Sequence, residues 1–170
     1  MFIRRRDASR PHLRPIDQPG SSSPVLTLHD YGRLETSICE RHDLASRMQT
    51  RIQAKLADAR VVPGSQIPET VVTLGSIVRY RVDGDRIERR MLQFDREPAP
   101  NGQYVCVFTP VGLALLGQSQ GDTLDTTTFE GRPLRIVISS VEFQPESDTR
   151  RRESSCNDDS PPYGGGPEAA

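Results

Sequence analysis

The residues of this chain that could bind a metal ion lie close together near position 40. Glu40, His42 and Asp43 bring two carboxylates and one imidazole onto the same short segment. Hard divalent cations prefer carboxylate oxygens, but a resident metal site needs more ligands than one such turn supplies. We therefore expect no metal centre here. We expect Asp43 to cap a helix, and Glu40 and His42 to be solvated surface groups.

Other chemistry is scarce along the chain. Cys39, Cys106 and Cys156 give an odd count with no paired spacing, which argues against a disulfide framework or a zinc site. We expect reduced thiols, with Cys106 buried as a small apolar residue. The phosphate-binding and zinc-protease motifs are missing from the sequence, and no serine has a histidine placed with a carboxylate to activate it. We therefore predict no catalytic residue and no cofactor.

A proline-led run over Thr109–Gly117 is the most informative segment, and Gln120, Gly121 and Asp122 follow it. It is typical of a strand end, a helix that begins at a proline, a glycine that stops the helix, and a turn into the next strand. We expect the helix to bury apolar side chains against a sheet, namely Val111, Leu115 and Leu116.

This run resembles the C-terminal signature of the Gre transcript-cleavage factors, and more closely that of the Rnk proteins, the regulators of nucleoside diphosphate kinase. Ile67–Val78 and Val141–Glu146 resemble further Rnk segments in the same order, so the match extends from about residue 24 to residue 146. The resemblance implies an FKBP-like domain that docks on RNA polymerase near its secondary channel. It also implies that the docking residues are those of the proline-led turn: Thr109, Pro110, Val111 and Gly112.

The same resemblance implies a helical arm that enters the secondary channel. In Gre factors, acidic residues at the tip of a long arm help to hold the second catalytic magnesium ion. Here, helices of about 13 and 16 residues would reach only roughly 20–25 Å at 1.5 Å per residue. Glu40 and Asp43 also reverse the Gre order of aspartate before glutamate. We therefore predict a non-enzymatic regulator that occupies the channel and excludes longer-armed Gre-type factors by mass action.

Three other functions stay open. A transcript-cleavage factor would act through Glu40 and Asp43, and an adaptor would bind nucleoside diphosphate kinase directly. A prolyl isomerase would need a pocket walled by aromatic side chains, whereas this chain has no tryptophan and only 5% aromatic residues. The Rnk resemblance implies an effect on nucleoside diphosphate kinase levels, and the residues leave open whether that effect is direct.

Two periodicities predict the elements that position these residues. Between residues 28 and 59, apolar residues recur every three or four positions with a break near residues 40–43, which predicts an antiparallel helical hairpin. We expect Thr27 to cap the first helix, with Asp30 completing a capping pair. From Thr70 onward the period becomes two, as in Val78, Tyr80 and Val82, which predicts strands.

Turn residues separate these strands at 83–85, 101–102 and 130–131. The sequence therefore predicts an α+β protein in which the hairpin precedes an antiparallel sheet of about five strands with one short helix. We expect a disordered basic tail at 1–24, the hairpin at 25–64, the FKBP-like domain at 65–146 and a disordered tail at 147–170.

The distribution of charged residues along the chain indicates which kind of partner it binds. The first tail carries five arginines against two aspartates, whereas residues 25–146 are mildly acidic. Clustered basic residues are needed to bind nucleic acid, so a protein partner fits the central domain better, and DNA or RNA would be met only within the polymerase complex. No apolar run approaches the roughly 20 residues of a membrane span. We expect a cytoplasmic monomer.

Overall fold

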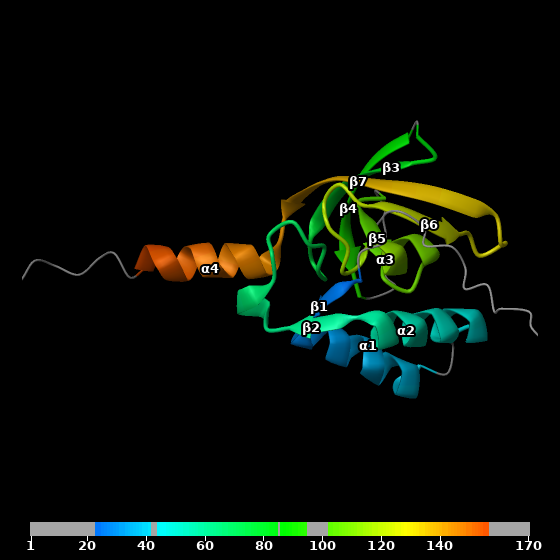
Figure 1. Cartoon of the computed structure of the whole chain (residues 1–170), viewed down its shortest axis with the longest axis horizontal. Coiled ribbons are helices and arrows are strands. Elements are labelled where there is room, and N and C mark those ends of the chain that lie inside the picture. The colour runs from blue at the N-terminus through cyan, green and yellow to red at the C-terminus, as the bar shows by residue number, and fades with distance from the viewer. Residues whose placement is uncertain (1–22, 42–43, 85, 95–101, 157–170) are drawn as a thin grey trace, which may run out of the picture.

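The computed structural model describes residues 23–41, 44–84, 86–94 and 102–156. A five-stranded sheet forms one layer, and two helices of 13 residues each form a second layer alongside it (Figure 1). The expected α+β class is confirmed. Within the described ranges, no helix is long and apolar enough to cross a membrane.

The helical layer is built from β1 (Val25–Thr27), α1 (Leu28–Glu40), α2 (Ser46–Asp58) and β2 (Arg60–Val62). The strands β1 and β2 pair in parallel, a feature that the sequence did not predict. Thr27 caps α1 as expected, because its hydroxyl accepts a hydrogen bond from the amide of Asp30 at 3.0 Å.

The N-cap of α2 differs from the expectation. Ala45 occupies the cap position without a side-chain hydrogen bond, two residues after the expected cap. The helix α2 begins later than the apolar pattern indicated. Helix ends are commonly uncertain by one or two residues. His42 and Asp43 themselves lie outside the described residues.

The main sheet has the strand order β5-β4-β3-β7-β6. Its strands are β3 (Ile77–Val82), β4 (Arg86–Gln93), β5 (Tyr104–Cys106), β6 (Thr123–Thr127) and β7 (Pro133–Phe143). Neighbouring strands are antiparallel except β4 and β5, which are parallel. The expectation of a wholly antiparallel sheet is therefore wrong at β5. A tight turn forces an antiparallel pair, and the longer connection after β4 does not.

Turn residues behave as the sequence predicts at two places. Asp83 and Gly84 have φ angles of 49° and 89°, so both central residues of the β3–β4 turn are left-handed. Val82 pairs with Arg86 across this connection, so the turn is short and uses left-handed residues, as tight turns between antiparallel strands often do. Gly131, at the β6–β7 turn, has a φ angle of 86°. The expected turn at 101–102 lies partly outside the described residues.

One hydrophobic core joins the two layers. Val78, Tyr80 and Ile138 on the inner face of the sheet belong to the same buried cluster as Leu34 of α1 and Ile52 of α2. The short helix α3 (Pro110–Leu115) lies between the layers and adds its buried leucines to that cluster (Figure 1). The expected boundary at residues 64–65 therefore does not separate two cores.

Polar contacts reinforce this joint. The Lys55 ammonium of α2 donates to the carbonyls of Leu113 at 2.6 Å and Ala114 at 3.2 Å, at the C-terminal end of α3. A cation there interacts favourably with the helix dipole. Arg51 donates to both the carbonyl and the hydroxyl oxygen of Thr127 on β6. The helices are therefore fixed to the sheet at several points.

The expectation of disorder from residue 147 onward is corrected by a helix, α4 (Pro145–Cys156). Glu146 and Asp148 lie in its first turn, where acidic side chains are stabilised by the helix dipole. Arg150 donates to the carbonyl of Gly64 at 2.8 Å and thereby ties the helix to the body. Overall composition does not reveal such positional signals. Residues 157–170, like residues 1–22, lie outside the described ranges.

Candidate functional site

The proline-led turn forms the expected helix start. Thr109 is the N-cap of α3, and its hydroxyl accepts from the amide of Gly112 at 3.0 Å while it donates to the carbonyl of Cys106 at 2.7 Å. Pro110 follows at the first helical position, where its missing N–H costs no hydrogen bond. Gly117 ends the turn with a φ angle of 78°.

Burial changes the role of two of the expected docking residues. Pro110 and Gly112 are buried, and a Cβ atom on Gly112 would lie 2.1 Å from the Cys106 carbonyl oxygen. The glycine is therefore required by close approach within this chain. Little surface of Pro110 and Gly112 is exposed, and direct contact of these two residues with a partner stays a prediction. Thr109 and Val111 are half-buried and keep part of their surface exposed.

An apolar cup of about 230 Å³ lies beside Thr109. Its apolar wall is formed by Leu44 before α2, Met48 in the first turn of α2, Phe108 before α3 and Phe129 after β6. The ring of Phe129 is 64% exposed, which is unusual for a large apolar side chain next to other apolar groups. The cup offers a recess that an apolar side chain of a partner could fill.

The sequence did not identify the cup. Phe129 directly precedes the expected turn at 130–131, and nothing local shows that its ring stays exposed. Cys106, expected in the core, is half-buried at the cup and its sulfur accepts from the amide of Phe108 at 3.4 Å. These residues come together only through the tertiary fold.

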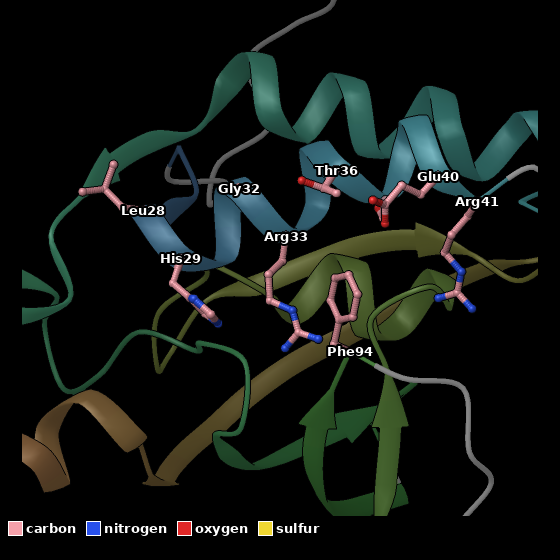
Figure 2. Close-up of a pocket in the computed structure, with 9 residues that line it drawn as sticks. Leu28, His29, Gly32, Arg33, Thr36, Glu40, Arg41 and Phe94 are labelled. Carbon is pink, nitrogen blue, oxygen red and sulfur yellow. The ribbon is translucent and has the colours of Figure 1, made fainter.

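A second, larger cavity of about 520 Å³ runs along α1 (Figure 2). The guanidinium of Arg33 lies over the Phe94 ring, 3.9 Å from its centroid. The Phe94 ring meets Phe108 edge-on, with centroids 5.0 Å apart, and the guanidinium of Arg41 lies 4.5 Å from the Phe108 centroid. Cations over aromatic faces are attracted by the ring quadrupole, which favours these positions of the two guanidinium groups.

One residue of the expected hairpin tip lies beside this cavity. Glu40 is the last residue of α1, is exposed, and lines the cavity along α1 (Figure 2). His42 and Asp43 lie outside the described residues. Among the residues that are described, no group of three or more histidine, cysteine, aspartate or glutamate side chains could hold a metal ion.

A buried carboxylate fixes the start of α1 to the sheet domain. Asp30 is 1% exposed, its amide donates to the Thr27 hydroxyl at 3.0 Å as the expected capping pair requires, and its Oδ2 accepts from the amide of Leu74 at 3.2 Å. Burial raises the pKa of Asp30 to about 6, and the nearby charge of Glu146 adds to the rise. Burial also lowers the pKa of Lys55 to about 7. Both groups lie where helices meet the sheet domain.

Known proteins resemble this chain over most of the described region. A family model described as "Transcription elongation factor, GreA/GreB, C-term" matches residues 67–143. The regulator of nucleoside diphosphate kinase of Escherichia coli K12 is 30% identical over 98 residues, covering 56% of this chain and 71% of that protein. The transcription elongation factor GreA of Christiangramia forsetii is 25% identical over 129 residues, covering 71% of this chain and 80% of that protein.

A solved structure is similar as well. The prokaryotic transcription elongation factor GreA/GreB from Nitrosomonas europaea is 31% identical, with a TM-score of 0.58. The similarity covers 72% of this chain and the whole of that chain.

Proposed function

Because the chain belongs to the family of the GreA/GreB transcription elongation factors and the regulators of nucleoside diphosphate kinase, we propose that it binds RNA polymerase and regulates transcription elongation. In this proposal the sheet domain is an FKBP-like docking module near the secondary channel, and α1 and α2 form a short hairpin at the channel entrance. The protein acts in the cytoplasm as a monomer and meets nucleic acid only within the polymerase complex.

The observation that carries the docking proposal is the apolar cup beside the proline-led turn. Phe129 and Phe108 offer apolar area, and Thr109 lies at the rim where the family resemblance predicts docking. Phe108 is buried and Phe129 is exposed, and an exposed aromatic side chain beside an apolar recess is typical of the centre of a protein interface. Pro110 and Gly112 support docking indirectly, because they hold Thr109 in place.

The short helices favour regulation without transcript cleavage. Each has 13 residues and therefore extends about 20 Å at 1.5 Å per residue. Both helices are also held in the core that they share with the sheet, which leaves little of their length free to project. We infer that the protein occupies the channel entrance, excludes longer-armed Gre-type factors by mass action, and supplies no carboxylate to the catalytic magnesium.

Binding to bacterial core RNA polymerase tests the docking proposal. We expect Phe129→Ser to weaken binding at least tenfold, about 1.4 kcal/mol, because it removes the largest exposed apolar group of the cup. Ile87→Ser is the matched control, since Ile87 is 60% exposed on β4 and does not line the cup. Equal affinities for the parent and Phe129→Ser would exclude the cup as the docking site.

A cleavage assay on stalled elongation complexes tests the regulatory part. The parent protein should stimulate no RNA cleavage and should inhibit cleavage by an added GreA-type factor. The substitution Glu40→Ala should change neither result. Cleavage that depends on Glu40 would show that the chain is a transcript-cleavage factor. Nucleoside diphosphate kinase belongs in the same binding series, because the name of one relative refers to it. Tight kinase binding without polymerase binding would favour the adaptor function.

A further inference from the structure

The turn that precedes β3 is held by acidic side chains from two different helices. From α1, Oδ2 of Asp30 accepts a hydrogen bond from the amide of Leu74 at 3.2 Å. From α4, Oε2 of Glu146 accepts from the hydroxyl of Thr73 at 2.7 Å. The turn itself is closed by Ser76, whose hydroxyl accepts from the Thr73 amide at 3.0 Å. Two carboxylates from distant segments therefore bind adjacent residues of one turn.

Burial makes this arrangement unfavourable when both carboxylates are ionised. Asp30 is 1% exposed, and its second oxygen, Oδ1, has no hydrogen-bond partner among the residues that the structure describes. A buried charge that lacks a donor costs free energy, and a like charge nearby adds to that cost. Burial raises the pKa of Asp30, and repulsion by Glu146 raises it further. A proton on Asp30 removes both costs, because the carboxyl becomes neutral and its O–H can donate.

Other charged groups near this pair do not cancel the effect. His29, the neighbour of Asp30 on α1, lowers the pKa of Asp30, but burial has the larger influence and the pKa is about 6. His29 and Arg33 line a cavity of about 720 Å³ together with Glu146. The residues of β4 that line it, 91–93, carry no titratable group. Asp30 therefore titrates just below neutral pH.

The attachment of α4 to the body depends on polar contacts. Every residue of α4 between its first and its last is polar or charged, and residues 151–155 are exposed. The helix continues from β7 and extends away from the sheet (Figure 1). Besides the contact at its first turn, Arg150 donates to the carbonyl of Gly64 at 2.8 Å. Arg151 pairs with Glu69, but such exposed ion pairs contribute little. The electrostatics of the first turn therefore weigh heavily in the docking of α4.

We propose that Asp30 and Glu146 form a proton-dependent latch that controls the docking of α4. When Asp30 carries a proton, Glu146 keeps its bond to Thr73 and α4 stays on the body. When Asp30 ionises, the two carboxylates repel each other and the first turn of α4 opens more often. Because such coupling is reciprocal, release of α4 must lower the pKa of Asp30 by the same free energy. The latch does not depend on polymerase binding.

Hydrogen exchange of the backbone amides of residues 149–152, corrected for the intrinsic effect of pH, tests the latch. The opening equilibrium constant should rise about fivefold between pH 5 and pH 8, because a like charge shifts a buried carboxyl pKa by about 1. Glu146→Gln keeps an acceptor for Thr73 but removes the charge, so this rise should disappear. Asp148→Asn is the matched control, since Asp148 lies in the same first turn and pairs with Arg152. It should keep the rise.

A carboxyl NMR titration of Asp30 gives the reciprocal measurement. Its pKa should fall by about 1 in Glu146→Gln and stay unchanged in Asp148→Asn. Asp30→Asn imitates the protonated state and should make α4 exchange slow at every pH, whereas His29→Gln should leave the pH response in place. An Asp30 pKa that is the same in Glu146→Gln and the parent would overturn the latch. So would α4 exchange that does not change with pH, or a pH response lost in His29→Gln.

Discussion

Replacement of Gly112 by alanine should destabilise the protein strongly, although alanine is the better helix former. The added Cβ would lie 2.1 Å from the carbonyl oxygen of Cys106, 2.7 Å from its carbonyl carbon and 3.1 Å from Oγ1 of Thr109. Two of these atoms belong to the backbone, so no flexible side chain can move aside. The start of α3 must instead shift away from Cys106.

That shift weakens the hydrogen bonds that anchor the turn. The hydroxyl of Thr109 accepts from Gly112 at 3.0 Å and donates to the Cys106 carbonyl at 2.7 Å, and the Thr109 amide donates to that carbonyl at 3.0 Å. Overpacking of a buried site costs about 1–3 kcal/mol, and each weakened hydrogen bond costs about 0.5–1.5 kcal/mol. After the gain of about 1 kcal/mol in helix propensity is subtracted, we expect a net loss of about 2–4 kcal/mol.

Urea unfolding followed by circular dichroism measures this change. Gly32→Ala is the matched control, because it makes the same chemical change in a helix where nothing lies within 4 Å of the new atom. It should stabilise the protein by about 0.8–1 kcal/mol. The reasoning fails if Gly112→Ala is as stable as the parent, or if the two variants shift stability in the same direction.

Two further predictions concern stability. The pKa of Asp30 is about 6 when folded and near 3.8 when unfolded, so between these values the folded state binds more protons and stability rises as the pH falls. Between pH 7 and pH 5 the free energy of unfolding of the parent should rise by about 1 kcal/mol relative to that of Asp30→Asn, as measured by urea unfolding. An equal pH response in the two proteins would contradict this. Truncation after Gln144 should lower the free energy of unfolding by roughly 1–3 kcal/mol, because it removes the carboxylate of Glu146 that accepts from the Thr73 hydroxyl and the guanidinium of Arg150 that donates to the Gly64 carbonyl. Truncation after residue 156 should cost nothing measurable. Limited proteolysis that trims rapidly through α4 would contradict the second prediction.

Local chemistry explains which parts of the fold the sequence predicts. The proline at the start of α3, the threonine caps and the left-handed turn residues act within a few positions, so their types reveal the structure directly. The strands follow from alternation, because Val78 and Tyr80 must face the core together. The family resemblance rests on these same local signals.

The remaining features depend on contacts between distant segments. Asp30 has the spacing of a capping residue, but its carboxylate bonds to an amide 44 positions later in the chain. Arg33 has the position of a solvated helix residue, but it stacks on Phe94 from the end of β4. The parallel pairing of β5 likewise depends on where the chain returns. None of these contacts leaves a periodic pattern in the sequence.

The shared core also constrains how the helices and the docking turn can act. Leu44, two residues before α2, lines the cup together with Phe108 and Thr109, which precede α3. Ile52 continues from there into the core of the sheet, so α2 cannot swing outward without opening that core. Removing a fully buried aliphatic side chain from a core costs about 2–5 kcal/mol, which makes such an opening rare. In the proposed docking, a partner that fills the cup would therefore contact the helical layer and the sheet domain at once, and the docking would also fix the position of the helices on polymerase.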